Sequence, residues 1–220
     1  MKRHETPFLR RLYYSFVEAC FVFFMAPFFR IEVENRPDFK SLGPVVLAPN
    51  HTSYLDPPVL QHACRDHVTF LMTEAIYRLA PVRWFFKAWG AIPVPEGGVA
   101  ARALKDALEA IRSGRIVAIF PEGHISRDGF MNRGRGGVAT LIARGQVPVI
   151  PVAILGTYDA LPRHRKWPRR AHVLVRFGEP MASPGRLPKE GVQEFADQIM
   201  DAIAQLGAQK RPAGKALAHE

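Results

Sequence analysis

Short, continuously apolar runs alternate with helical patterns along most of the chain. Residues 45–48 and 149–154 are apolar at every position or nearly so, which is typical of strands that are buried on both faces. Between such runs, apolar side chains recur on one helical face, as they do over residues 99–111 before Gly114. The pattern predicts strands at 45–48, 68–72, 91–94, 116–120, 149–154 and 172–177, and helices at 99–111, 138–143 and 190–206.

This alternation of strands and helices predicts an α/β domain with a mixed, largely parallel sheet flanked by helices. In such sheets the loops at the carboxyl ends of the strands carry the chemistry. We predict three regions: a membrane-associating helical segment over 1–35, the α/β domain over 36–207 and a flexible tail over 208–220.

The N-terminal segment joins basic residues to an aromatic-rich apolar stretch. Lysine and arginine precede residues 12–29, which Ser15 and Glu18 interrupt. The stretch is shorter than the roughly 20 apolar residues that a spanning helix needs. Aromatic side chains flanked by arginine favour the membrane interface, so we expect an interfacial or shallowly inserted helix. The alternative is a helix packed against the domain.

The composition of the chain says nothing about its fold, but its net charge indicates which partners it favours. The 220 residues contain 30 Lys and Arg against 20 Asp and Glu, a formal charge of +10 that favours anionic lipid, phosphorylated substrates or nucleic acid. The densest basic run, 163–170, suits lipid head groups, CoA phosphates or an acidic carrier protein, or is a solvated loop. Cys20 and Cys64 have no nearby ligand cluster, which argues against a disulfide framework or a zinc site.

The first polar motif, Asn-His-Thr-Ser-Tyr-Leu-Asp at 50–56, directly follows a predicted strand. On a straight helix, side chains five positions apart point about 140° away from each other. A strand-to-helix turn can bring His51 and Asp56 together as a catalytic pair, in which the imidazole takes a proton from an attacking hydroxyl and the carboxylate orients it. Alternatively, Asp56 only caps a helix that begins at Pro57 and Pro58.

The second polar motif begins at Phe120 and also follows a strand. It brings a carboxylate, a glycine, a hydroxyl and an arginine onto one loop, and two further arginines come before the next helix. Guanidinium groups and backbone amides at a helix start suit a phosphate, and a solvated basic turn is the alternative. The residues concerned are Glu122, Gly123, Ser126, Arg127, Arg133 and Arg135.

Together the two motifs resemble those of the glycerolipid acyltransferase family, which contains the 1-acylglycerol-3-phosphate acyltransferases. The sequence at 50–56 matches the family's first motif, Phe-Pro-Glu-Gly at 120–123 with Ser126 its third, and residues 147–152 its fourth. The resemblance implies transfer of a fatty acyl group from acyl-CoA or acyl carrier protein to the hydroxyl of a lysophospholipid in phospholipid biosynthesis. It also implies no metal or other cofactor, and a peripheral or monotopic location on the cytoplasmic face of a membrane.

The resemblance further assigns roles to residues. It makes His51 the general base and Asp56 its partner, and it places Glu122 and Gly123 at the acceptor site. Two departures concern the acceptor head group. Glu96 stands where the second motif usually has a phosphate-binding arginine, and His124 and Ile125 replace the usual threonine and arginine of the third motif.

Ser126, Arg127, Arg133 and Arg135 are therefore our candidates for contact with the acceptor, or else the head group is not like glycerol 3-phosphate. Three other classes of function compete. No nucleic-acid-binding motif supports a nucleic-acid partner. A thioesterase or lipid hydrolase could use His51 to activate water, and the intact His51–Asp56 pair argues against a non-catalytic scaffold.

Overall fold

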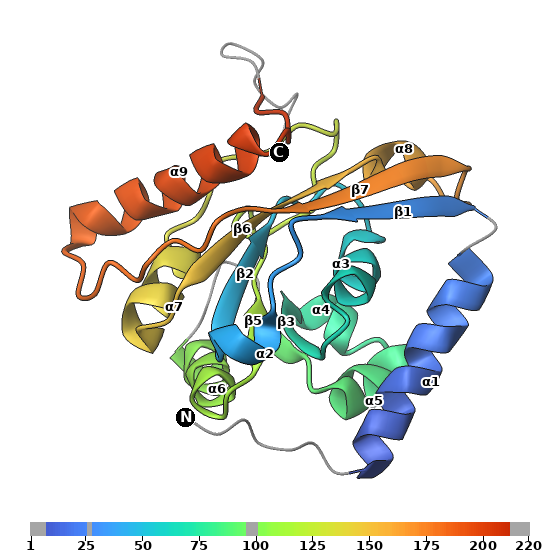
Figure 1. Cartoon of the computed structure of the whole chain (residues 1–220), viewed down its shortest axis with the longest axis horizontal. Helices are drawn as coiled ribbons and strands as arrows, with labels where there is room; N and C mark the ends of the chain where they lie inside the picture. The colour runs from blue at the N-terminus through green and yellow to red at the C-terminus, as the bar shows by residue number, and fades with distance from the viewer. Residues whose placement is uncertain (1–7, 26–27, 96–100, 212–220) are drawn as a thin grey trace.

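The computed structural model describes residues 8–25, 28–95 and 101–211, which form a three-layer α/β/α domain (Figure 1). Within these residues a seven-stranded sheet has the order β1-β7-β6-β2-β5-β3-β4. Neighbours along the central strands run parallel, β7 is antiparallel to β6, and β1 is parallel to β7. The predicted mixed, largely parallel sheet is confirmed. The strands are β1 Phe29–Glu34, β2 Val45–Pro49, β3 Val68–Thr73, β4 Ile92–Val94, β5 Ile116–Ala118, β6 Val149–Leu155 and β7 Ala171–Phe177.

Helices cover both faces of the sheet. Helices α6, α7 and α9 lie over one face, and α1, α3 and α5 lie on the other side (Figure 1). The helices are α1 Phe8–Met25, α2 Phe39–Leu42, α3 Asp56–Cys64, α4 Glu74–Tyr77, α5 Ala80–Trp89, α6 Ala101–Arg112, α7 Gly137–Gly145, α8 Thr157–Ala160 and α9 Lys189–Gln205.

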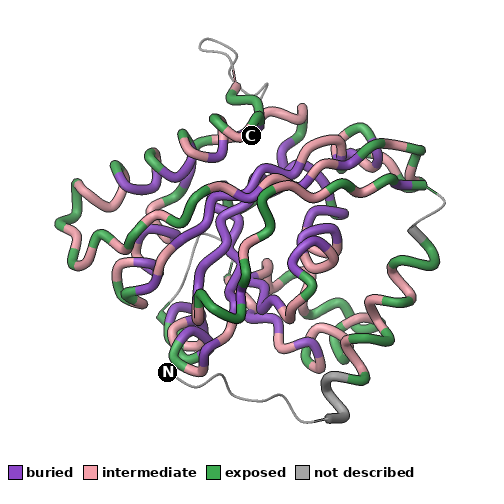
Figure 2. Tube along the Cα trace, in the orientation of Figure 1, coloured by how far each residue is buried: buried purple, intermediate pink, exposed green. Residues whose placement is uncertain are grey.

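The sheet separates two hydrophobic cores. In β2, Val45 and Leu47 face the core under α3, whereas Val46 and Ala48 face the core under α6, α7 and α9. All four are fully buried, because successive side chains of a strand point to opposite faces and both faces are covered here. The buried centre of the sheet runs through the molecule in Figure 2.

Three parallel strands end at the edge of the sheet where the two polar motifs lie. Leu47 of β2 lies opposite Ala118 of β5 on one side and Ile150 of β6 on the other. The carboxyl ends of β2, β5 and β6 therefore meet at the same edge of the sheet, and the loops that follow them lie side by side. The two polar motifs follow β2 and β5, so the fold places them together as expected.

The N-terminal helix α1 has two different faces. Tyr14 stacks on His67, with ring centroids 3.8 Å apart, and packs edge-on against Trp89. On the other face Phe16 and Phe23 are 66% and 76% exposed. None of the helices in the described part of the chain combines the length and apolar character that crossing a bilayer requires.

Two predicted boundaries are wrong. Residues 29–34 form strand β1, which pairs with β7, so the sheet begins inside the segment that we predicted to be helical. At the other end, residues 208–211 pack onto the domain: Gln209 O accepts the N–H of Met131, and Arg211 pairs with Asp128. The remaining tail (212–220), the first seven residues, and Glu96 and the rest of 96–100 lie outside the described residues.

Candidate active site

The site begins where β2 ends. The amide of Asn50 makes two hydrogen bonds with the backbone of Ile154 in β6: its Nδ2 donates to the carbonyl at 3.0 Å, and its Oδ1 accepts the N–H at 2.7 Å. The Asn50 side chain thus extends the pairing of β2 with β6 by one residue. These two hydrogen bonds hold the next residue, His51, just beyond the end of β2.

His51 and Asp56 come together across the turn into α3. His51 Nδ1 lies 2.9 Å from Asp56 Oδ2, and the Asp56 side chain is fully buried. The same oxygen accepts the backbone N–H groups of Thr52 and Ser53, at 2.7 and 2.8 Å. These amides precede the helix, so Asp56 does not act as the simple helix cap of our alternative reading.

This pairing fixes the tautomer of the imidazole. An ionised carboxylate can only accept hydrogen bonds, so Nδ1 of His51 carries the hydrogen and Nε2 keeps a lone pair. The His51 side chain is 14% exposed, against 0% for Asp56. A base oriented in this way can take a proton from a hydroxyl docked beside Nε2.

The ring of His51 is also held by a stacked aromatic side chain. Phe120, just after β5, lies with its ring centroid 3.9 Å from that of His51 at an interplanar angle of 22°. Phe120 belongs to the core under α3. Its packing therefore fixes the plane of the imidazole, while Asp56 fixes the rotation of the ring within that plane.

A threonine that our sequence analysis missed completes the support of Asp56. Thr157 Oγ1 donates to Asp56 Oδ1 at 2.6 Å and lies 3.2 Å from Thr52 Oγ1. Thr157 follows Gly156, whose φ of +82° turns the chain after β6. Nothing in the local pattern around residue 157 could have linked it to Asp56, because the contact depends on β6 lying beside β2.

Glu122 joins the two polar motifs from beneath the surface. Its carboxylate is fully buried and accepts the N–H of His51 at 2.8 Å and both the N–H and Nδ2 of Asn132, at 2.8 and 3.0 Å. Burial raises the pKa of Glu122 to about 7, although the hydrogen bonds from Asn132 and His51 oppose that shift. In this structure the Glu122 carboxylate therefore positions the His51 backbone, and its contact with an acceptor stays a prediction.

Ser126, like Glu122, is buried and bonded to the backbone of His51. Its backbone N–H donates to the carbonyl of His51 at 2.8 Å, and its hydroxyl bonds Asp128 and the N–H of Gly129. The side chain is fully buried. Ser126 therefore shapes the loop that carries the second motif.

The three predicted arginines point to different partners. Arg133 pairs with Asp197 of α9 at 3.2 Å. Arg127 is exposed on the loop, where its carbonyl accepts the hydroxyl of Tyr158. Arg135 is exposed and lies against Gly123. Their contact with an acceptor stays a prediction. The described residues contain no group of three or more His, Cys, Asp or Glu side chains that could hold a metal ion.

Comparisons with known proteins agree with this geometry. A family model described as Acyltransferase matches residues 30–155, which is more than half of the chain. The 1-acyl-sn-glycerophosphate acyltransferase PlsC from Thermotoga maritima has a similar fold, with a TM-score of 0.74 over 92% of this chain and 83% of that chain, at 22% identity.

Curated relatives show the same likeness in sequence. A chloroplastic 1-acyl-sn-glycerol-3-phosphate acyltransferase of Brassica napus is 27% identical, over 62% of this chain and 40% of its own. One of Arabidopsis thaliana is 26% identical, over 71% and 44%. An N-acylphosphatidylethanolamine synthase of Arabidopsis thaliana is 28% identical, over 68% and 58%. The chain thus spans about half the length of these relatives. The family that the two motifs predicted is confirmed, and the chain belongs to the acyltransferase family.

Proposed function

We propose that the protein is an O-acyltransferase that moves a fatty acyl group from a thioester, acyl-CoA or acyl carrier protein, to the hydroxyl of a lysophospholipid. The observation that carries this proposal is the His51–Asp56 pair at 2.9 Å, with its tautomer fixed by a carboxylate that four groups hold in place. The pair lies in the part of the chain that matches the acyltransferase family.

The reaction needs one base and no enzyme nucleophile. The acceptor hydroxyl attacks the thioester carbonyl carbon while His51 Nε2 takes its proton. The tetrahedral intermediate then expels the thiolate, which takes that proton back from the imidazolium, so a C–O bond forms and a C–S bond breaks. Asp56 stabilises the imidazolium between the two steps. General-base help of this kind contributes about 10²–10⁴ in rate.

The two serines of the motifs support direct attack by the acceptor. Ser53 is fully buried, and its hydroxyl donates to the carbonyl of Leu161 at 2.6 Å and accepts the N–H of Leu55. Ser126 is fully buried and bonded to Asp128. Both hydroxyls are thus bonded to partners other than the His51 imidazole, which favours direct attack by the acceptor over an acyl-enzyme.

Two acceptors compete. Relatives named as 1-acyl-sn-glycerol-3-phosphate acyltransferases favour lysophosphatidate. A relative named as an N-acylphosphatidylethanolamine synthase, together with His124 and Ile125 at the positions of the usual threonine and arginine, favours a different head group. We propose lysophosphatidate as the first acceptor to test, because Arg135 lies against Gly123 of the second motif and is suited to a phosphate.

The outer face of α1 supports a location on a membrane. Its exposed Phe16, Phe23 and Phe24 form an apolar surface on a helix that is anchored to the domain through Tyr13 and Tyr14. Such a face suits the boundary between head groups and acyl chains. Lysolipid acceptors reside there, so the helix would keep the site at the bilayer surface.

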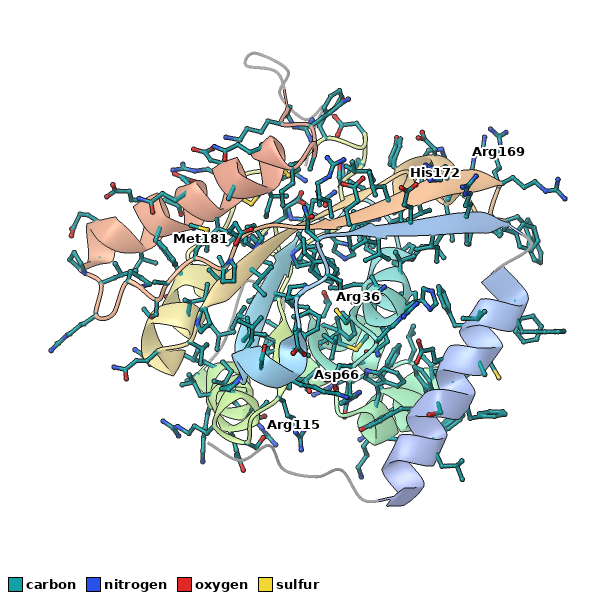
Figure 3. All side chains as sticks on the ribbon, in the orientation of Figure 1. Arg36, Asp66, Arg115, Arg169, His172 and Met181 are labelled. Atoms are coloured by element: carbon teal, nitrogen blue, oxygen red, sulfur yellow. The ribbon has the colours of Figure 1, made fainter. Side chains whose placement is uncertain are left out.

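The proposal is tested with purified protein in detergent micelles, palmitoyl-CoA and a panel of lysolipids, following thiol release and lipid product together. The panel contains lysophosphatidate, zwitterionic lysophospholipids and lyso-aminolipids. The matched control for His51→Ala is His172→Ala, which removes an exposed imidazole paired with Glu32 at the surface of β7 and β1 (Figure 3).

We expect thiol release coupled to one new diacyl product, lost in His51→Ala and kept in His172→Ala. Thiol release without lipid product would instead identify a thioesterase. Near wild-type transfer by a folded His51→Ala variant would overturn the mechanism. If palmitoyl-CoA is not used, the palmitoyl carrier protein is the second donor, and failure with both donors would reject acyl transfer.

A further inference from the structure

Two arginines and a histidine from two loops lie near the two polar motifs. His124 and Arg135 belong to the long loop between β5 and α7, and Arg163 follows α8. All three are exposed. They come from loops at the carboxyl edge of β5 and β6, the strands on either side of β2, so the fold gathers them beside the catalytic motif although none belongs to it.

Arg135 is held over the second motif. Its backbone N–H donates to the carbonyl of Pro121 at 2.9 Å, and its side chain lies across Gly123. A Cβ at Gly123 would sit 3.1 Å from both Cδ and Nε of Arg135, closer than side chains normally pack. The glycine of this motif thus provides room for the arginine, and its φ of +73° suits glycine as well.

Arg163 is held beside the first motif. Ser53 forms an isolated β-bridge with Pro162, and its hydroxyl donates to the carbonyl of Leu161. These contacts attach the segment just before Arg163 to the loop that carries His51. Arg163 is therefore anchored at its backbone, while its side chain remains exposed.

The environment of His124 includes both arginines. Partial burial lowers the pKa of His124, and the positive charges of Arg135 and Arg163 lower it further. Neither Arg135 nor Arg163 forms an ion pair with a carboxylate in the described parts of the chain, whereas Arg133 pairs with Asp197 and Arg211 pairs with Asp128.

Guanidinium groups that face a substrate site without a counter-ion are suited to a phosphate, which they bind through charge-assisted hydrogen bonds. We infer that Arg135, held over the second motif, and Arg163, held beside the first, bind the phosphate of a substrate in place of the two arginines that the family motifs usually supply, with His124 as a third contact. The inference rests on the proposed function and names its substrate class, a phosphate ester. Two sources offer that chemistry: the head group of the lysolipid and the phosphates of the CoA donor.

The experiment compares Arg135→Gln, Arg163→Gln and the double variant with wild type under four substrate pairs. The acceptor is lysophosphatidate or the phosphate-free 1-acylglycerol. The donor is palmitoyl-CoA or the phosphate-free palmitoyl thioester of N-acetylcysteamine. Arg144→Gln removes one exposed charge from the last turn of α7, at the other end of that helix, and serves as the control for net charge.

Hydrogen bonds to a charged group are worth about 1.5–3 kcal/mol, so we expect each variant to raise the KM of the phosphate-bearing substrate by about tenfold or more. We expect kcat to change much less. The rise in KM of a variant over wild type should vanish when the substrate that carries the bound phosphate is replaced by its phosphate-free form. The substrate for which it vanishes, acceptor or donor, is the one whose phosphate the arginines bind. Arg144→Gln should match wild type.

Two outcomes would contradict phosphate binding by Arg135 and Arg163. One is a KM that stays raised with both phosphate-free substrates, and the other is a double variant whose KM values equal those of wild type. Binding of lysophosphatidate and of 1-acylglycerol in micelles, measured by calorimetry without a donor, separates this inference from the proposed function. A loss of lysophosphatidate binding in the double variant supports binding of the acceptor phosphate even if no acyl transfer occurs. Unchanged binding together with unchanged KM for CoA rejects it.

Discussion

Thr157 Oγ1 donates to Asp56 Oδ1 at 2.6 Å, and both side chains are fully buried. Asp56 uses its other oxygen for His51 and two backbone amides. Thr157 therefore acts on the imidazole through the carboxylate: it is a positioning residue that lies 101 residues from its partner.

Thr157→Val should remove this hydrogen bond with little change of shape. A buried acceptor left unsatisfied costs about 1–3 kcal/mol, so we expect the thermal midpoint to fall and kcat to drop by roughly tenfold or more. Thr157→Ser keeps the hydroxyl and should retain most of the thermal midpoint and of kcat. Steady-state kinetics and thermal unfolding measure these two quantities. A valine variant with wild-type kcat would contradict the positioning role of Thr157.

Asp56→Asn should separate charge from geometry. The amide oxygen can take the place of Oδ2 and accept from His51, Thr52 and Ser53, while the amide NH₂ donates to Thr157. The variant should therefore fold, but it lacks the negative charge that stabilises the imidazolium. We expect kcat to fall by about 10²–10⁴ with KM little changed. More than a tenth of wild-type kcat would argue against Asp56 as the partner of the base.

Glu122→Gln should change how stability depends on pH. Burial raises the pKa of Glu122 from 4.5 to about 7 in the folded protein. Between these values the unfolded chain releases the proton while the folded protein keeps it, so the contribution of Glu122 is fully present below pH 4.5 and is lost as pH rises through 7. The loss is on the order of 3 kcal/mol.

The measurement is urea unfolding of wild type and Glu122→Gln from pH 4 to 9. The free energy of unfolding of wild type, taken relative to the variant, should decline from pH 4.5 to 7 and level off above about pH 8. A difference that is constant with pH would show that Glu122 titrates normally.

Gly156→Ala should disrupt the turn that presents Thr157. A Cβ at this position would lie 2.1 Å from the carbonyl oxygen of His172, and φ is +82°. The β7 backbone must therefore move, and we expect a loss of about 2 kcal/mol or more in the free energy of unfolding. Gly185→Ala is the control, because φ is +70° but nothing lies within 4 Å. An equal loss in both variants would show that backbone strain, not the clash, decides the cost.

Replacing Phe16, Phe23 and Phe24 of α1 with serine should abolish binding to vesicles. Burying one such side chain contributes about 1.5–3 kcal/mol, so sedimentation with anionic vesicles should weaken by far more than tenfold. The thermal midpoint should stay nearly unchanged, since these side chains are exposed. Tyr14→Ser, on the packed face, should instead destabilise the fold. Unaltered vesicle binding in the triple variant would reject the interfacial role of α1.

The amino-acid sequence determined the local elements and the edge at which chemistry occurs. Continuous apolar runs marked β2, β5 and β6, because strands buried on both faces need apolar side chains at nearly every position. His51 and Glu122 could be placed near each other, since each follows a parallel strand and the carboxyl ends of parallel strands share an edge. The first strand escaped prediction although residues 29–34 alternate apolar and polar side chains, because they directly follow a long aromatic stretch that was interpreted as helix.

Only the tertiary structure decided which side chains meet. Thr157 reaches Asp56 because β6 lies beside β2, and Arg133 pairs with Asp197 because α9 packs over that face of the sheet. Local patterns report burial and periodicity within one element, whereas these partners depend on strand order and on the paths of loops. The sequence therefore named the candidate base and its carboxylate, and the packing of distant strands determined which groups hold that carboxylate and which arginines have carboxylate partners.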